Sequence, residues 1–294
     1  MRNFTLCDMH CDTATKIYDN NENLFFPSIP YTQFFAVFIS PEYYNSPKER
    51  FFNVINNMYN EFLKNSQKIK FCKLLSDIES NKLNAFLSIE GGEIIDNLNS
   101  LEMLYHLGIR MITLTWNNDN QIGGANGSSN GLTPFGEDVV RKMNELGIII
   151  DLSHASEKTF FDVCKISTRP VVLSHSNSHS ICPNPRNITD TQFEEIKKLN
   201  GCVGINFYPP FLNNKRSATI YDIIEHIEYF LSLDGENNIG IGSDFDGMDC
   251  LTEGIESIRD VYKIFDILSS RGVQDETLKK IAYKNIYRVM GICL

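Results

Sequence analysis

The chain has 294 residues, of which 42% are hydrophobic and 22% charged, and its formal net charge is −10 at neutral pH. This composition is that of an ordinary globular protein, and the length lies within the usual range for a single barrel. The negative charge and the lack of a basic stripe argue against nucleic acid as a partner. The thinly spread basic residues argue against an anionic membrane.

Eight short apolar runs follow one another along the chain and are predicted to be β-strands. Most are rich in Val, Ile and Leu with little polar alternation, which is typical of parallel strands covered on both faces. They span residues 4–11, 32–40, 84–90, 110–115, 148–153, 170–174, 202–208 and 239–243.

Amphipathic stretches between these runs are predicted to be helices, because their apolar residues recur about every 3.6 positions. They span residues 48–64, 136–146, 189–199 and 220–233, and two more close the chain at 258–269 and 275–290. Repeated strand–helix units predict an α/β fold, a (β/α)8 TIM barrel.

One domain over residues 1–294 is expected, since no linker, low-complexity tract or internal repeat interrupts the pattern. Two segments exceed a minimal barrel: residues 43–75, and a Gly/Asn/Ser-rich loop at 117–132. Loops on the carboxyl face of a barrel shape its substrate pocket.

The cysteines and the N-terminal residues favour a cytoplasmic protein. Residues 1–6 run straight into the first predicted strand without a leader pattern, and no apolar stretch is long enough to cross a bilayer. The eight cysteines include no C-x-x-C pair and read as buried, reduced thiols. Cys11 lies next to candidate ligands, but strand alternation points its side chain away from them.

The histidines divide into two groups. His10, His154 and His175 end predicted strands, whereas the others lie in helical patterns (106 and 226) or in a loop (179). Carboxylates at positions 12, 90 and 244 also follow strands. All strand ends of a barrel converge on one face. Three imidazoles gathered there with carboxylates predict a metal site, and we expect it to hold two ions.

The donor types set the expected metal and the arrangement of the ligands. His10 and Asp12 are two residues apart on a strand and share a face. Imidazole nitrogen with carboxylate oxygen suits Zn²⁺, with Mn²⁺ and Fe²⁺ as alternatives. Glu90, before Gly91 and Gly92, has two oxygens that could bridge two ions. A helix-capping or ion-pairing role is the alternative for that residue.

The motifs around these residues resemble those of the membrane dipeptidase (renal dipeptidase) family, which are zinc metallopeptidases among the amidohydrolase-like, metal-dependent hydrolase barrels. The matching stretches occur in family order over nearly the whole chain. They are DMHCDT at 8–13, SIEGG at 88–92, residues 131–156, SHS at 174–176, PRN at 185–187, NFY at 206–208 and GSDFDG at 242–247.

The resemblance implies a set of metal ligands. His10 and Asp12 would hold one zinc ion. His154 and His175 would hold the second, and Glu90 would bridge the two as part of the catalytic centre.

The resemblance also implies the residues that meet the substrate. Arg186 would bind the free carboxylate of a dipeptide, which a planar guanidinium matches. Asp244 would move a proton during catalysis and contact the substrate, and Tyr208 would contact it as well. Many relatives have a histidine where this chain has Trp116, its only tryptophan. Trp116 is therefore either a substrate contact that cannot become cationic or a packed core residue.

The resemblance implies a binuclear zinc dipeptidase, and relatives often accept a D-residue at the C-terminal position of the dipeptide. Two alternatives stay open. One is a related metal-dependent hydrolase of another amide or a cyclic substrate, and the other is a barrel that binds peptide without cleaving it. Relatives are often dimers, so a homodimer is a further expectation that the residues themselves leave open.

Overall fold

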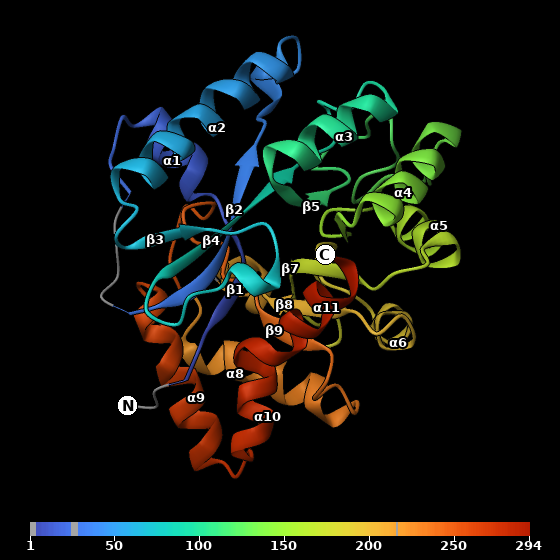
Figure 1. Ribbon diagram of the computed structural model, residues 1–294. Coiled ribbons are helices and arrows are strands. Elements are labelled where there is room, and N and C mark those ends of the chain that lie inside the picture. Colours follow the sequence, from blue (N-terminus) through green and yellow to red (C-terminus); the bar gives the residue numbers. More distant parts are fainter. Residues whose placement is uncertain (1–3, 25–28, 216) are drawn as a thin grey trace.

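The computed structural model describes residues 4–24, 29–215 and 217–294, and its strands form a parallel barrel ringed by helices (Figure 1). The strands are β1 Cys7–Cys11, β2 Tyr31–Phe38, β3 Ile69–Phe71, β4 Leu83–Glu90, β5 Ile109–Thr113, β6 Ile149–Asp151, β7 Val171–Ser176, β8 Cys202–Ile205 and β9 Ile239–Ile241. Round the ring the order is β2-β1-β9-β8-β7-β6-β5-β4, and pairing of β2 with β4 closes it. The prediction of a (β/α)8 TIM barrel is confirmed.

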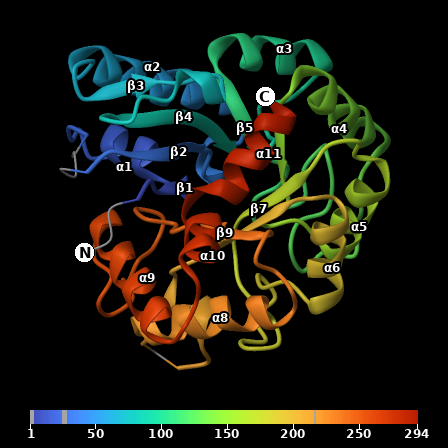
Figure 2. The same cartoon turned by 60° about the horizontal axis from the view of Figure 1, so that its bottom comes forward.

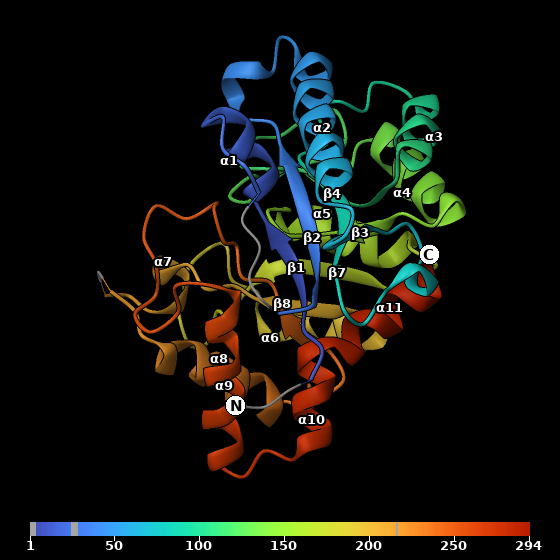
Figure 3. The same cartoon turned by 60° about the vertical axis from the view of Figure 1, so that its left-hand side comes forward.

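Helices follow most strands and cover the outside of the barrel. They are α1 Thr13–Asp19, α2 Pro47–Lys64, α3 Leu98–Leu107, α4 Pro134–Leu146, α5 Glu157–Ile166, α6 Asp190–Lys198, α7 Pro209–Leu212, α8 Ile220–Ser232, α9 Val261–Ser270, α10 Asp275–Lys279 and α11 Asn285–Cys293. Figure 3 shows α1 and α2 near the blue strands, and both helices contact β2 as well as each other. Most of segment 43–75 is thus α2, the helix that follows β2.

Helix boundaries follow from local sequence. Helix α4 begins where the Thr133 hydroxyl accepts a hydrogen bond from the Gly136 N–H, with Pro134 in the first turn. It ends at Gly147, whose φ of 81° is the left-handed conformation that glycine adopts without strain.

The structure differs from the predicted elements in a few places. The strand β3 was not predicted. It pairs with Leu83–Ala85 at the start of β4. Strand β5 pairs with the later residues of β4, from Leu87 onward. The predicted helical ranges also lack α1, α3, α5 and α7, although position 106 of α3 was assigned to a helical pattern, and β1 begins at Cys7 rather than at residue 4. The closing helix predicted at 275–290 consists of α10, a π-helical turn at Lys280–Lys284, and α11.

Buried side chains form two clusters, one between the strands and the outer helices and one at the base of the barrel. The second includes Phe34, Phe86 and Met111 from the strands and Met290 from α11. Helix α11 crosses the amino end of the barrel (Figure 2), where the Cys293 thiol donates to the carbonyl oxygen directly before β7. Phe86 and Glu90 share a face of β4, so this apolar base lies beneath Glu90.

Among the described residues, no helix is both long and apolar enough to cross a membrane.

Candidate active site

The predicted site residues meet at the carboxyl end of the barrel. His10, Glu90 and His175 lie on β1, β4 and β7, and each is almost fully buried. The others lie on the segments that directly follow strands: Asp12 after β1, Trp116 after β5, His154 after β6, Arg186 after β7, Tyr208 after β8 and Asp244 after β9. Nine residues spread over more than 230 positions of sequence thus converge because parallel strands end on one face.

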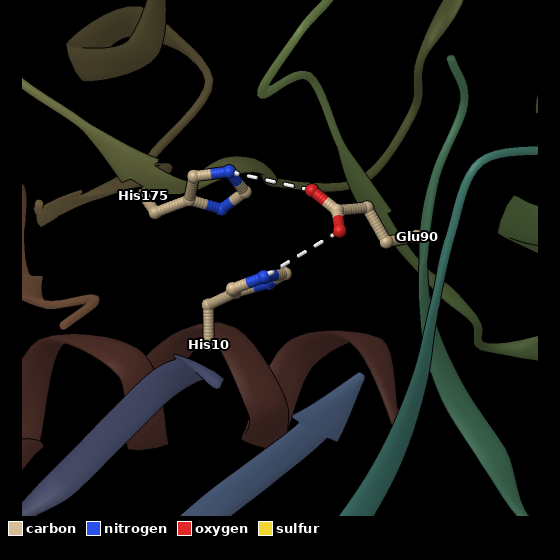
Figure 4. Close-up of side chains that lie close together, drawn as sticks. All are labelled: His10, Glu90 and His175. Atoms are coloured by element: carbon tan, nitrogen blue, oxygen red, sulfur yellow. Dashed lines mark ion pairs between the residues drawn. The ribbon is translucent and has the colours of Figure 1, made fainter. Parts of the chain in front are cut away.

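Glu90 lies at the centre of this group, and its two carboxylate oxygens face different histidines (Figure 4). Oε1 lies 2.9 Å from Nε2 of His154 and 3.6 Å from Nε2 of His175. Oε2 lies 3.9 Å from Nε2 of His10. Each carboxylate oxygen thus has a different nearest imidazole, while the His10 and His175 rings themselves lie 4.0 Å apart between centroids.

The two paired histidines are held in matching orientations. Their Nε2 atoms lie 2.9 Å apart. Nδ1 of His154 lies 2.8 Å from Oδ1 of Asn117, and Nδ1 of His175 lies 2.8 Å from Oγ of Ser174. Because Ser174 Oγ donates to a carboxylate, its lone pair accepts from His175. These contacts favour a proton on Nδ1 of both rings, which would leave Nε2 facing the centre as the nitrogen that binds metal.

The opposite side of Glu90 carries the remaining ligand candidates. Nε2 of His10 lies 3.4 Å from Oδ2 of Asp12 and 3.9 Å from Oδ1 of Asp244. Among the described residues, His10 Nε2 and Asp12 Oδ1 are buried atoms without a hydrogen-bond partner. Buried polar atoms are normally satisfied, and a cation that displaces the proton of His10 would satisfy both atoms. Imidazole and carboxylate donors fit a zinc ion.

The pKa of His10 is shifted in the opposite direction from the pKa values of His154 and His175. Burial would lower the pKa of His10, but the carboxylates of Glu90, Asp12 and Asp244 outweigh it and raise the pKa to about 10. Burial keeps the pKa of His154 and of His175 well below the usual range, so both are neutral. The excess of carboxylates round His10 makes this half of the site attractive to cations.

Two of the site residues have strained backbones. His154 and Asp244 have φ values of 68° and 66°, a region that non-glycine residues seldom occupy. The His154 carbonyl accepts hydrogen bonds from the Asn126 N–H at 2.7 Å and from the Thr115 hydroxyl at 3.2 Å. The surrounding loops therefore hold His154 in a conformation that is typical of functional positions.

Arg186 faces the same pocket from the loop between β7 and α6. Its Nε and Nη2 atoms are buried and have no hydrogen-bond partner among the described residues. The guanidinium carbon lies 5.4 Å from the centre of the Phe211 ring. Burial lowers the pKa of Arg186, while Asp244 and Glu90 oppose the shift. A guanidinium with two free donors on one edge is suited to a carboxylate.

The pocket above these residues has a volume of about 750 Å³. Trp116 and Tyr208 line it, and both are partly exposed, so Trp116 is a pocket residue rather than a fully packed core residue. The Trp116 ring lies 4.8 Å from that of Phe38, measured between centroids.

Several residues of the site were not found by sequence reasoning. Asn117 orients His154, Asp151 and Ser174 support His175, and Phe38 forms a wall of the pocket. Serine directly before a strand-end histidine was a usable signal for Ser174. No such sequence signal pointed to Phe38 or Asp151, because whether their side chains face the inside of the barrel depends on the strand register.

The remaining histidines and Cys11 lie outside the centre, as predicted. His106 is exposed on α3, and His226 is buried in α8 between the Ser178 N–H and the Leu212 carbonyl oxygen. His179 lies in the loop that leads to Arg186. Cys11 packs in the outer apolar cluster.

Sequence comparison places this chain among known peptidases. Residues 28–293 match the profile of the membrane dipeptidases (peptidase family M19). The chain is 36% identical over 231 residues to an uncharacterized dipeptidase of Schizosaccharomyces pombe, which covers 76% of this chain and 55% of that protein. It is 34% identical over 218 residues to the dipeptidase TcpJ of Claviceps purpurea, with 72% and 51% covered. The chain therefore spans about half the length of these two relatives.

Solved structures share the fold. A metallopeptidase from Rhodobacter sphaeroides, liganded with a phosphinate mimic of the dipeptide L-Ala-D-Ala, superposes with a TM-score of 0.91 at 22% identity over the full length of both chains. A family M19 metallopeptidase called dipeptidase AC gives 0.91 at 24% identity over 99% of both chains. An amidohydrolase from Pseudomonas aeruginosa gives 0.82 at 25% identity over 88% of this chain and 87% of the other.

Proposed function

Because this chain belongs to the membrane dipeptidase family (peptidase family M19), we propose that it is a binuclear zinc dipeptidase. His10 and Asp12 would hold one ion, His154 and His175 would hold the other, and Glu90 would contribute to both. The observation that carries the proposal is the position of Glu90 among three histidines and Asp12, with Oε1 nearest His154 and His175 and Oε2 nearest His10.

The chemistry of the donors supports zinc at both positions. Each half-site offers imidazole nitrogen and carboxylate oxygen, which zinc accepts readily, and the contacts of His154 and His175 favour an unprotonated Nε2. When bound, such a pair of ions supplies a nucleophile from water at neutral pH and polarises a carbonyl group.

Arg186 supports a substrate that ends in a free carboxylate close to the scissile bond. Its two unpaired donors face the pocket beside the ligand cluster. A fixed guanidinium there selects substrates with one residue after the scissile bond, since a longer peptide would place an amide against the cation. Tyr208 lies in the same wall and contacts this residue of the substrate.

Asp244 supports the proton transfers of hydrolysis. Its Oδ2 accepts a hydrogen bond from Nδ2 of Asn206 at 3.0 Å, which fixes the carboxylate at the edge of the centre. Burial raises the pKa of Asp244 to about 6, near the value that suits a general base at neutral pH. Asp244 takes a proton from the attacking water and returns it to the leaving amine.

The Rhodobacter structure contains a mimic of a dipeptide that ends in D-Ala. On that likeness we include dipeptides with a C-terminal D-residue among the substrates. Trp116, in place of the histidine of many relatives, favours a second candidate, a hydrolase of N-acylated or cyclic amides.

The decisive experiment compares a free dipeptide with its C-terminal amide. The parent enzyme is expected to cleave the free acid and to cleave the amide poorly. Arg186→Ala should lower kcat/KM for the free acid by about 10²-fold or more, the usual effect of truncating one partner of a buried charge pair. Arg141→Ala is the matched control, because Arg141 is exposed on α4, pairs with carboxylates of its own helix and lies outside the residues that line the pocket.

Equal cleavage of the free acid and the amide by the parent would contradict the dipeptidase assignment. Cleavage of N-acylated or cyclic amides in preference to free dipeptides would favour the second candidate.

A further inference from the structure

The pocket has an aromatic wall that the proposed function does not use. Phe38 is the last residue of β2, and Trp116 follows β5. Strand β4, which carries Glu90, lies between β2 and β5 in this part of the ring, so the two aromatic residues come at or just after the ends of its two neighbouring strands. Their centroids are 4.8 Å apart with an interplanar angle of 52°. Both side chains are partly exposed into the cavity and form one continuous apolar surface.

Phe38, at one end of this wall, is the last residue of a strand on the opposite side of the barrel from the strand that precedes Arg186. Trp116, in contrast, follows β5, which is two strands from β7. Counted round the ring, β7 is four strands from β2, which is the opposite side of an eight-stranded barrel. Arg186 follows β7, and its neighbour Phe211 follows β8. A dipeptide with its carboxylate on Arg186 and its scissile bond at Glu90 therefore extends its N-terminal residue toward Phe38.

Two acidic residues that line the pocket, Asp19 and Asp246, are already paired. Both oxygens of Asp19 accept hydrogen bonds from Arg50, at 2.6 and 2.7 Å. Asp246 is bound by Lys16 at 2.8 Å and by the Thr13 hydroxyl at 2.6 Å. A charged substrate side chain would have to break one of these pairs, whereas an apolar side chain gains contact area with the two rings.

Resting on the proposed function, we propose that Phe38 and Trp116 form the subsite for the side chain of the N-terminal residue. The enzyme then belongs to the dipeptidases that prefer a large apolar residue, aromatic or branched, at that position. The C-terminal residue is selected separately, by the wall that contains Phe211.

Two series of free dipeptides test this with the zinc-loaded protein. The first varies the N-terminal residue (Gly-Ala, Leu-Ala, Phe-Ala, Lys-Ala), and the second varies the C-terminal residue (Ala-Gly, Ala-Leu, Ala-Phe). In the first series kcat/KM should rise by about 10- to 100-fold from Gly to Phe, the range that apolar pockets achieve, with Lys-Ala below Leu-Ala. Phe38→Ala should reduce this ratio to a few-fold and leave the ratios of the second series unchanged.

Phe211→Ala is the matched control, which should weaken cleavage of all dipeptides without altering the N-terminal ratio. The milder variant Phe38→Leu covers the case in which Phe38→Ala folds poorly, and it should narrow the N-terminal ratio in the same direction. Trp116 is the only tryptophan, so its fluorescence gives a second readout. A phosphinate mimic with N-terminal Phe should change the emission more, and bind more tightly, than one with N-terminal Gly.

A parent enzyme that cleaves these dipeptides without an N-terminal preference, or prefers Lys-Ala, would overturn the subsite while leaving the dipeptidase assignment intact. A ratio of kcat/KM between Phe-Ala and Gly-Ala that stays unchanged in both Phe38 variants would also overturn the subsite. Zinc-loaded protein that cleaves none of the dipeptides would overturn the proposed function, and the subsite with it.

Discussion

Asp151 is a fully buried carboxylate that fixes the end of β7 from a position outside the ligand cluster. Its Oδ2 accepts hydrogen bonds from the Ser174 hydroxyl at 2.6 Å and from the Thr113 hydroxyl at 2.5 Å. Ser174 in turn accepts from Nδ1 of His175. This series of hydrogen bonds from His175 through Ser174 to Asp151 sets the orientation of the His175 ring and increases the basicity of the nitrogen that would bind zinc.

Asp151→Asn should therefore weaken the binding of one of the two zinc ions by about 10- to 100-fold, the usual effect of losing an outer partner of a ligating histidine. The measurement is a zinc titration against a competing chromogenic chelator. Thr113→Val is the control, since it removes one hydrogen bond from Asp151 and leaves the link to Ser174 in place. Unchanged affinity for both zinc ions in Asp151→Asn would contradict the role of these hydrogen bonds in orienting His175.

His226 supports the loop that carries Arg186. Its Nδ1 accepts from the Ser178 N–H at 3.1 Å, and its Nε2–H donates to the Leu212 carbonyl oxygen at 2.9 Å. Burial lowers the pKa of His226 to about 4, although the Leu212 carbonyl and Asp222 oppose the shift. The neutral ring is the form that the fold requires.

The sign of the pH effect follows from this pKa. Above about pH 6.5 the ring is neutral in both the folded and the unfolded chain, and it adds no pH dependence. Between about pH 6.5 and pH 4 the unfolded chain takes up the proton first, so stability is lost as pH falls, by up to about 3 kcal/mol. Urea unfolding at pH 7.5 and pH 4.5 should show a smaller loss in His226→Asn than in the parent. Equal losses would contradict the buried neutral state.

At the scale of elements, the loop at 117–132 is held together by hydrogen bonds and forms part of the site. Asp119 accepts hydrogen bonds from the Ala125 N–H at 2.8 Å, the Ser128 hydroxyl at 2.8 Å and Nδ2 of Asn130 at 2.7 Å. The same loop supplies the Asn126 N–H that holds the strained His154 backbone. The conformation of this loop is thus linked to the position of His154.

Asp119→Ala should loosen this loop, because three donors lose their common acceptor. Hydrogen exchange of residues 117–132 is expected to become faster, while the exchange of barrel strands stays as in the parent. Zinc affinity should fall along with the loss of protection. Asp138→Ala is the control, since Asp138 is exposed on α4 and pairs with Arg141 of the same helix. A loop that keeps full protection in Asp119→Ala would show that this network does not hold it.

The elements differed in how far sequence could predict them. Strands with a dense run of Val, Ile and Leu were all predicted, because burial on both faces leaves a continuous apolar signal. The three-residue β3 escaped because it is shorter than any reliable periodic window. Helix α1 also escaped. It spans only the seven residues Thr13–Asp19, too few for a clear helical period, although Asp12 before it is a residue type that often begins helices.

At the scale of the whole molecule, the barrel explains why the residues of the site could be predicted better than its geometry. A histidine or carboxylate that follows an apolar run must reach the carboxyl face, whatever its position in sequence. Which oxygen of Glu90 faces His10, and that Phe38 and Trp116 meet above it, depends on strand order and on closure between β2 and β4. That closure pairs residues 52 positions apart, such as Tyr31 with Leu83, and no local pattern encodes it.

The central claim is that one barrel end holds two metal ions on either side of Glu90. The most direct test is elemental analysis of zinc-loaded, dialysed protein. We expect two ions per chain in the parent and one in His175→Ala, with a folded protein in both cases. The control His106→Ala, at an exposed histidine of α3, should keep two. One ion or none in the parent, or two tightly held ions in His175→Ala, would contradict the binuclear centre.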